Sequence, residues 1–528
     1  MANKLELTWY GKDNPILVEP RLLIETAALS NIADSPGTEN MLIHGDNLLA
    51  LKALENRYAG QVKCIYIDPP YNTGSTFEHY DDNLEHSQWL QLMRPRLEIL
   101  WRLLSEEGSL WISIDDDEHA YMKVLCDELF GRGQFIASII WQKRTSPDMR
   151  AIISGGHDYI LVYAKNRDLF KETRNKLPLT EDQATNYKNP DNDPRGPWAS
   201  SDFTAQGWRP NQMYTITTPS GKVVVPPEGR CWRHLEDVFM QLMQEGRLWF
   251  GADGSGVPRK KTYLSESEGI APWTWWTNKE VGHNQEAKKE IIALFGAANA
   301  FDTPKPERLI ERIIHIATNP GDLVLDSFLG SGTTVAVAHK MSRRYIGIEM
   351  GNHAYTHCKV RLDKVIAGED QGGITKSAKW EKGGGYRFYE LAPTLINEDI
   401  FGEAVINPDY SADMLAAAVA LHEGFTYQPD SNLFWKQARG NENSYLFTTT
   451  RHLTADYLEA IKNSMEKAEY LVIACRSFDK GLDKAYKNIA VKKIPQMLLE
   501  RCEFGKTDYN LNIVHPPVYE DGEEYCDE

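Results

Sequence analysis

The chain has 528 residues, 42% of them hydrophobic and 25% charged, which is typical of folded soluble proteins and too long for a single ordinary core. No apolar run approaches the roughly 18 residues that span a bilayer, and the first residues lack a signal-peptide core, so we expect a cytoplasmic protein. Seven scattered cysteines without a CxxC pair argue against a disulfide framework and against a structural zinc site.

The net charge of −17 argues at first against a nucleic-acid partner, but the charge is unevenly distributed. Residues 1–140 carry a net charge of −11 and residues 391–528 carry −10, whereas residues 141–300 and 301–390 each carry +2. A polyanion is therefore expected to bind the middle of the chain rather than its ends.

The first part of the chain alternates between predicted strands and helices. A short strand ends at Gly45-Asp46, and a buried strand ends at Asp68. The expected elements are a strand and helix within 41–54, a strand at 62–67, a helix from about Ser87 to Ser105, a strand at 109–114 and a helix at about 117–130. This order predicts a parallel sheet with helices on its faces.

The alternation stops after Trp141. One more strand is predicted at 157–166. The sequence from there to about 280 shows no regular hydrophobic pattern and is rich in tryptophan. A hairpin is predicted at 214–229, around Pro219-Ser220-Gly221. We interpret 167–280 as an inserted, loop-rich lobe.

The alternation resumes after this lobe. Helices are predicted at 305–318 and 333–341, and strands at 321–328 and 344–350. A separate acidic region follows the glycine run at 383–385, with a helix expected at 411–424 and a strand at 470–475. The expected domains are therefore 1–166, 167–280, 281–390 and 391–528.

A stiff corner, Asp68-Pro69-Pro70-Tyr71, follows the second strand. Such a sequence can be a simple turn, because Asp-Pro and Pro-Pro commonly end strands. It can also activate an exocyclic amino group, whose lone pair is delocalised into the base. The Asp68 carboxylate and the Pro69 carbonyl would accept its two N–H bonds and free the lone pair. Tyr71 would stack on a base flipped out of the duplex.

A glycine loop at 326–334 joins a predicted strand to a predicted helix. Gly330 and Gly332 would let a cofactor approach the backbone, and the helix start offers N–H donors. Glu349 ends the next strand, where a carboxylate can accept hydrogen bonds from ribose. A bare GxG loop serves nucleotide, flavin and adenosyl cofactors, and it can also be only a tight turn. Since both motifs end parallel strands, we expect them to share one cleft.

These residues resemble the S-adenosylmethionine-dependent DNA amino-methyltransferases. Residues 68–71 are similar to the family's catalytic signature and residues 328–332 to its cofactor loop. The signature precedes the loop, with a large segment between them, which is the order of the β group. The segments that resemble modification (Mod) subunits of type III restriction–modification systems are 193–205, 246–261, 280–290 and 500–513.

The resemblance implies an α/β fold: a Rossmann-like, seven-stranded, largely parallel methyltransferase sheet with a reversed hairpin at one edge and a C-terminal α+β domain. The strands that end at Asp68 and Asp326 would be neighbours. It also implies S-adenosyl-L-methionine as cofactor and no metal. The implied catalytic residues are Asp68, Pro69, Pro70 and Tyr71. The implied cofactor-binding residues are Asp46, Lys305, Asp326, Phe328, Gly330, Ser331, Gly332, Thr333 and Glu349.

The implied reaction is methylation of adenine N6, because the signature begins with Asp rather than Ser. The implied partners are double-stranded DNA, read by the lobe 167–280, a second copy in a homodimer, and an ATP-dependent restriction (Res) subunit. The chain has no GxxxxGK[ST] loop of its own. We expect the acidic residues 391–528 to contact protein. Alternatives are a cytosine-N4 methyltransferase, a non-catalytic DNA-recognition subunit, or a nicotinamide dehydrogenase.

Four further groups have a structural interpretation beside a functional one. The acidic run 115–118 is expected to begin a helix rather than to bind a metal. The basic run 259–261 would contact phosphate or lie in a solvated loop. The tryptophans 273, 275 and 276 would form a lobe core or a base-stacking surface. His353 and His357 are expected to be structural.

Overall fold

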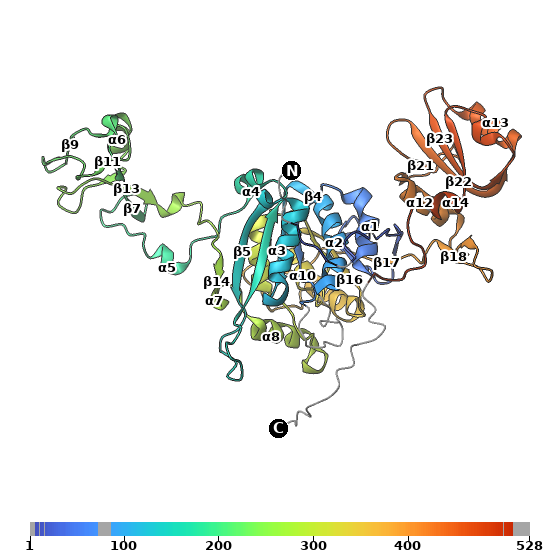
Figure 1. The fold of residues 1–528 in the computed structure, drawn as a ribbon. Coiled ribbons are helices and arrows are strands. Elements are labelled where there is room, and N and C mark those ends of the chain that lie inside the picture. Colours follow the sequence, from blue (N-terminus) through green and yellow to red (C-terminus); the bar gives the residue numbers. More distant parts are fainter. Residues whose placement is uncertain (1–5, 10, 15, 72–85, 500, 510–528) are drawn as a thin grey trace. The chain divides into compact units, whose positions relative to one another are not determined.

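The structure is a computed structural model that describes residues 6–9, 11–14, 16–71, 86–499 and 501–509. The chain divides into two compact units, Met1–Asn175 with Trp273–Glu528, and Lys176–Pro272 (Figure 1). The smaller unit lies within the predicted lobe 167–280, while α4 (Arg167–Thr173) and α7 (Asn278–Val281) belong to the larger unit. None of the described helices is long and apolar enough to cross a membrane.

A ten-stranded sheet organises the larger unit, in the order β1-β17-β2-β16-β15-β3-β4-β6-β5-β14. The strands β2, β16, β15, β3 and β4 run parallel to one another, and β6 is antiparallel to both β4 and β5. Their bounds are β1 Leu23–Glu25, β2 Met41–His44, β3 Val62–Ile67, β4 Leu104–Ile114, β5 Phe135–Gln142, β6 His157–Ala164, β14 Trp275–Trp276, β15 Leu323–Asp326, β16 Arg344–Glu349 and β17 Arg387–Leu391.

The expected methyltransferase sheet is therefore present, with the reversed strand β6 near one edge, and β3 and β15 are neighbours as predicted. The sheet has ten strands rather than seven, because β17 and β1 extend it beyond β2 and β14 extends it beyond β5. Two of the added strands, β1 and β14, have only three and two residues, too few to show a period of two in the sequence.

Two groups of helices cover the sheet. The first, α1 (Asn47–Tyr58), α2 (His86–Leu103) and α3 (Asp116–Phe130), shares one hydrophobic cluster with β3 residues Ile65 and Ile67. In the second group, α9 (Glu307–Ala317) packs against β3 and β4, and α10 (Thr333–Lys340) packs against β15 and β16. Helix α11 (Val360–Ala367) packs against α10. Because both faces of β3 are covered, its segment reads as a continuous apolar run. Helix α8 spans Asn284–Phe295.

The smaller unit is built from short strands around an aromatic core that includes Phe203, Trp232 and Phe239. The predicted hairpin is confirmed, since β9 pairs antiparallel with β10. Its elements are α5 Glu181–Ala184, β7 Trp198–Asp202, β8 Thr204–Gln206, β9 Ile216–Thr217, β10 Val223–Val224, β11 Arg230–Trp232, α6 Glu236–Gln244, β12 Leu248–Trp249 and β13 Arg259–Tyr263.

The C-terminal region forms a five-stranded sheet in the order β20-β21-β22-β23-β24 and a separate hairpin. The predicted helix and strand are confirmed as α12 and β23. The elements are β18 Ile396–Glu398, β19 Ala404–Ile406, α12 Ala412–Glu423, β20 Thr426–Tyr427, β21 Ala438–Arg439, β22 Ser444–Leu453, α13 Ala455–Ser464, β23 Tyr470–Phe478, β24 Ile489–Lys493 and α14 Gln496–Leu499. The six described cysteines are free and buried, and Cys526 lies outside the described residues.

After this region the chain returns to the large sheet. The Glu503 N–H donates a hydrogen bond to the Leu17 carbonyl at 2.9 Å. Tyr509 is buried in the cluster of α1–α3, and its N–H donates to the Asp46 carboxylate at 3.2 Å. Arg501 still pairs with Glu423 of α12 at 2.8 Å, so residues 501–509 connect the C-terminal region to the cluster of α1–α3.

Candidate active site

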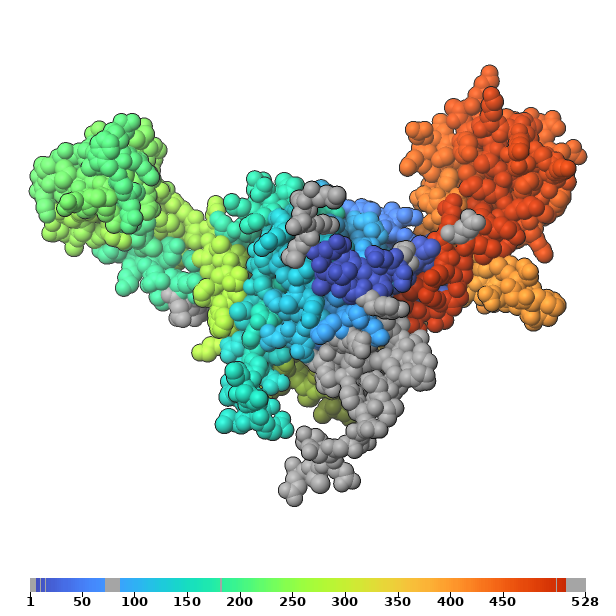
Figure 2. All heavy atoms as spheres, viewed as in Figure 1, coloured from blue at the N-terminus to red at the C-terminus, as the bar shows by residue number. Residues whose placement is uncertain are grey.

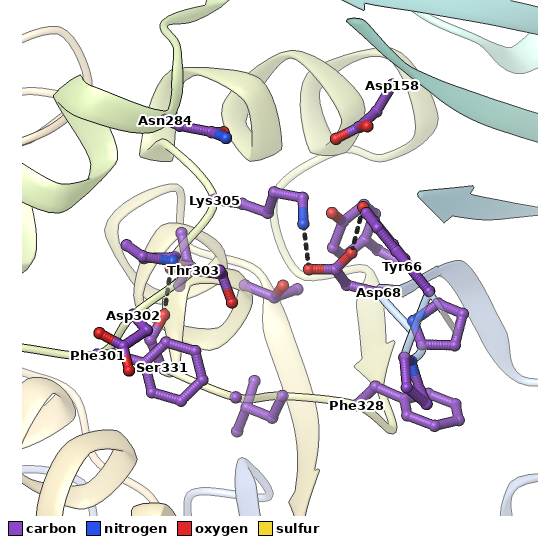
Figure 3. A pocket seen from close by; sticks show the side chains of 18 of the residues that line it. Tyr66, Asp68, Asp158, Asn284, Phe301, Asp302, Thr303, Lys305, Phe328 and Ser331 are labelled. Atoms are coloured by element: carbon purple, nitrogen blue, oxygen red, sulfur yellow. Dashed lines mark hydrogen bonds and ion pairs between the residues drawn. The ribbon is translucent and has the colours of Figure 1, made fainter. Parts of the chain in front are cut away.

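A cavity of about 430 Å³ lies where β3 and β15 end (Figure 3). Tyr71 of the corner and Phe328 of the glycine loop both line it, although more than 250 positions separate them in the sequence. The predicted site residues that line the cavity are Asp68, Pro69, Pro70, Tyr71, Lys305, Asp326, Phe328, Gly330, Ser331 and Thr333. Asp46, Gly332 and Glu349 are not among its lining residues.

Asp68, directly after β3, has both carboxylate oxygens engaged. Its Oδ1 accepts a hydrogen bond from the Tyr71 hydroxyl at 2.8 Å. Its Oδ2 pairs with the Lys305 ammonium, as Figure 3 shows. Burial and the nearby Asp68 charge raise the pKa of Tyr71 well above its usual value. The Lys305 ammonium also lies 5.1 Å from the centroid of the Tyr71 ring. The carboxylate thus already binds two donors, one of them cationic.

The two prolines of the corner differ in what their carbonyls bind. The Pro70 carbonyl accepts a hydrogen bond of 2.7 Å from the indole N–H of Trp89, a fully buried residue of α2. Among the described residues, none donates a hydrogen bond to the Pro69 carbonyl. Trp89 therefore anchors the corner to the core, and the role of the Pro69 carbonyl as second acceptor beside Asp68 stays a prediction.

The loop after β15 is held by Asp326, a buried carboxylate. One oxygen accepts from the Phe328 N–H at 2.9 Å, and the other accepts from the Thr334 hydroxyl at 2.6 Å. Burial raises the pKa of Asp326 to about 7. Gly332 has φ +78°, and a Cβ there would lie 3.0 Å from the Cα of Cys358. This position therefore requires glycine for its conformation and for its close packing.

Glu349 supports the glycine loop from behind. Its carboxylate accepts the N–H of Gly330 at 2.7 Å and that of Gly351 at 2.9 Å. Asp46 is the N-cap of α1, accepting the N–H of Leu48 at 2.9 Å, and it also pairs with the buried Arg96 at 3.2 Å. In this arrangement both carboxylates hold backbone, and their contact with a cofactor stays a prediction.

A buried charge cluster lies beneath the cofactor loop and was not predicted from the sequence. Arg361 donates to the Thr333 hydroxyl at 2.8 Å and pairs with Glu307 at 2.8 Å. Lys340 pairs with Glu307 and with Asp370, each at 2.7 Å. These four charged residues connect α9, α10 and α11 to one another, and Arg361 also binds Thr333 at the start of α10. The sequence contains no signal for them, because the four residues are scattered over more than 60 positions and form no motif.

Several cavity residues were also missed by sequence reasoning, among them Lys143, Asp158, Asn284 and Phe301. Asp158 is buried on β6 and pairs with Lys143, and burial raises its pKa. A charged residue within the mostly apolar strand sequence HDYILVYA could have indicated a functional role for Asp158. Asn284 begins α8, and Phe301 precedes the segment that carries Lys305.

The acidic run begins a helix, as predicted. Asp115 is the N-cap of α3, and its side chain accepts the N–H of Asp117 at 3.1 Å. Asp115 also lines the cavity, and burial together with the Asp117 charge raises its pKa to about 7. Asp115 therefore has a second role besides capping α3, because it lines the same cavity as Asp68.

The remaining groups differ from their predictions in part. Lys261 is buried and pairs with Asp193 at 2.9 Å, so this member of the basic run is neither solvated nor free for phosphate. Trp276 is buried in β14 of the large sheet rather than in the lobe core, whereas Trp273 and Trp275 are 59% and 50% exposed. The His357 Nε2–H donates to the Asn299 carbonyl at 2.9 Å, and its Nδ1 lies 2.8 Å from the Thr356 hydroxyl, in agreement with a structural role.

The cavity fits an adenosyl cofactor. Phe301, Phe328 and Leu329 give it apolar walls, and the polar residues Ser331 and Thr333 line it near the start of α10. At Gly330, where φ is +56°, a Cβ would lie 3.3 Å from the Phe301 ring. The loop is thus shaped so that a flat, partly apolar molecule can approach its backbone.

The chain is similar to known DNA methyltransferases. It is 37% identical over 339 residues to the type III restriction–modification enzyme StyLTI Mod subunit of Salmonella typhimurium, covering 58% of this chain and 50% of that protein. It is 31% identical over 426 residues to the probable HindVI Mod subunit of Haemophilus influenzae, covering 68% and 55%. The chain thus spans about half the length of these curated relatives.

Among solved structures, a putative DNA modification methylase from Thermus thermophilus complexed with S-adenosyl-L-methionine is 19% identical, with a TM-score of 0.33. It covers 67% of this chain and 100% of its own. The family model described as DNA methylase (N6_N4_Mtase) matches residues 62–359, which include both the corner and the glycine loop. The chain therefore belongs to the DNA methylase family.

Proposed function

We propose that the protein methylates adenine N6 in double-stranded DNA, using S-adenosyl-L-methionine, as the modification subunit of a type III restriction–modification system. The observation that carries the proposal is the single cavity shared by the Asp68–Tyr71 corner and the glycine loop after β15. The similarity to two Mod subunits supports the type III assignment. Asp rather than Ser at position 68 supports adenine N6.

The residues of the corner would orient the target amino group. Asp68 and the Pro69 carbonyl would accept its two N–H bonds, which frees the nitrogen lone pair for attack. The Asp68 oxygens now bind Tyr71 and Lys305, so the entering amino group would replace the Lys305 ammonium at Oδ2. The Lys305 side chain would then turn towards the glycine loop.

The glycine loop would hold the cofactor beside this amino group. When bound, S-adenosyl-L-methionine supplies an electrophilic methyl group. Phe328 and Phe301 would contact its adenosine part, while Gly330 and Ser331 would bring backbone within reach. The proton that the nitrogen loses on methylation would pass to water or to a carboxylate of the cavity wall, of which Asp115 has a pKa of about 7.

The proposed partners follow the charge distribution. DNA would bind at the lobe 167–280 and beside the cavity, because residues 141–300 and 301–390 each carry a net charge of +2, whereas the acidic segment 391–528 would repel it. A second copy of the chain in a homodimer, or an ATP-dependent Res subunit, would bind the acidic C-terminal region. We place the protein in the cytoplasm, where its DNA substrate lies.

A tritiated-methyl transfer assay tests this function. We expect label from S-adenosylmethionine to appear on adenine of duplex DNA. Label on cytosine would contradict the adenine assignment, and label on no DNA would contradict the methyltransferase assignment. Stabilisation by S-adenosylhomocysteine but not by NAD would separate this function from a dehydrogenase.

A further inference from the structure

The loop 143–156, between β5 and β6, carries three exposed apolar side chains at its tip. Met149, Ile152 and Ile153 are 89%, 103% and 90% exposed. In Figure 2 this loop, in teal, stands out from the larger unit. Single exposed apolar residues are common, but three neighbouring ones in water are unfavourable unless a partner covers them.

The loop has a defined conformation. The Lys143 N–H donates to the Gly156 carbonyl at 3.0 Å and closes its base. The Asp148 N–H donates to the Ser154 hydroxyl at 2.8 Å across the tip. The apolar side chains are thus presented on a folded turn, which lowers the entropy cost of inserting them into a partner.

The loop begins at the wall of the active-site cavity. Strand β5 leaves the sheet at the same edge as β4, because β6 is antiparallel to both. Its first two residues, Lys143 and Arg144, line the cavity beside Asp158 of β6. If a molecule places one of its groups in the cavity, the part of that molecule next to this group would therefore contact the loop.

Basic side chains accompany the apolar tip. Arg144 and Arg150 are both exposed, and Arg150 pairs with Asp148 on the same loop. Apolar tips flanked by arginines are suited to a partner that has a stack of flat apolar groups edged by negative charge, which is the chemistry of duplex DNA. A purely apolar protein groove would not require these cations.

We propose that the loop 143–156 is a wedge that enters the base stack of duplex DNA where the target adenine leaves it. Ile152 and Ile153 occupy the space vacated by the adenine and support the unpaired base, while Arg144 and Arg150 contact the flanking phosphates. Apolar wedges offset the cost of unstacking a base step, so the extruded adenine stays in the cavity for longer. This inference rests on the proposed adenine methylation.

The test compares two DNA duplexes in single-turnover methylation by the full chain. One has a normal thymine opposite the target adenine, and the other has an abasic site there, so no base pair must break. For the double variant Ile152→Ser/Ile153→Ser, we expect the rate on the paired duplex to fall about ten-fold or more. On the abasic duplex its rate should stay within about three-fold of the wild type.

A matched control changes another exposed apolar tip, Ile400 and Phe401, which are 92% and 82% exposed between β18 and β19. The variant Ile400→Ser/Phe401→Ser should methylate both duplexes as the wild type does. Wild-type rates for the Ile152/Ile153 variant on paired DNA, or equal losses on both duplexes, would overturn the wedge. If the wild type itself labels adenine in neither duplex, the proposed function fails instead.

Discussion

At the residue scale, Asp68 is the centre of the site. Both of its oxygens bind donors before any base is present, and one of these donors is the Lys305 ammonium. That ammonium occupies the position proposed for the target amino group. The corner is therefore preorganised for an N–H donor, because the acceptor geometry is set by Tyr71, Lys305 and the buried Trp89.

The substitution Asp68→Asn should lower kcat by about 10²–10³-fold, because an amide nitrogen would face the target N–H in place of an acceptor oxygen. Single-turnover transfer to duplex DNA measures this loss. Stabilisation by S-adenosylhomocysteine should be unchanged, which shows that the fold and cofactor loop are intact. A variant with wild-type kcat would remove Asp68 from the reaction.

Tyr71 allows its ring and its hydroxyl to be tested separately. If stacking is its main role, Tyr71→Phe should keep kcat within about ten-fold of the wild type, whereas Tyr71→Ala should lose about 10²-fold or more. Both are measured in the same assay. Equal losses for the two variants would instead assign the role to the hydroxyl bond with Asp68, which is 2.8 Å long.

The sequence could predict which residues gather at the cavity but not how they are bonded. Asp68 and Phe328 follow from motifs placed at strand ends, because neighbouring parallel strands end at one edge. Lys305 was expected from the family resemblance alone. The bonds of Glu349 to Gly330 and Gly351 could not be predicted, since they depend on the exact turn of the loop. Asp158 was missed because a buried charge on a strand has no motif of its own.

At the element scale, the buried charge cluster joins three helices beneath the cofactor loop. Glu307 on α9 binds both Lys340 on α10 and Arg361 on α11, and Arg361 reaches the Thr333 hydroxyl. Elements with long periodic segments were predicted well, because amphipathic spacing extends over several turns. Short strands such as β14 were not, since only the neighbouring strand β5 defines them.

Removing the shared carboxylate should destabilise this arrangement. Glu307→Ala leaves Lys340 with one carboxylate partner and removes the Arg361 pair, so we expect the free energy of unfolding to fall by about 3–5 kcal/mol. Denaturant unfolding of the variant and the wild type measures this difference in the free energy of unfolding. The control Glu311→Ala, one turn along α9 and only partly buried, should cost less than about 1 kcal/mol. Similar costs for the two would show that the cluster adds no specific stability.

Asp326 should make stability depend on pH. Its folded-state pKa is raised from 3.8 to about 7, so the folded protein holds a proton that the unfolded chain has already lost. This contribution is fully present below about pH 4 and is lost as the pH rises towards 7. Between these values the wild type should lose about 2–4 kcal/mol more stability than Asp326→Asn. Parallel pH profiles from denaturant titrations would contradict the assignment.

At the scale of the whole molecule, charge separates the proposed tasks. The acidic C-terminal region follows the methyltransferase sheet, and Tyr509 then packs into the hydrophobic cluster beside that sheet. Truncation at 391 would therefore also remove Tyr509 from the core of α1–α3. The role of the C-terminal sheet is better tested in the intact chain.

Hydrogen exchange on the full chain tests this separation. Added duplex DNA should slow amide exchange in the loop 143–156 and within 176–272, but not within 396–499, because the acidic region repels the polyanion. Raising the protein concentration without DNA should slow exchange within 396–499 if a second copy binds there. Protection of 396–499 by DNA would reverse the assignment.

The central claim, that the corner and the glycine loop form one site for adenine, is tested most directly by identifying the modified nucleoside. Duplex DNA is incubated with the protein and deuterated-methyl S-adenosylmethionine, digested, and analysed by mass spectrometry. The account predicts deuterated N6-methyldeoxyadenosine from the wild type and none from Asp68→Ala. Deuterated N4-methyldeoxycytidine, or the same adenine product from both proteins, would contradict it.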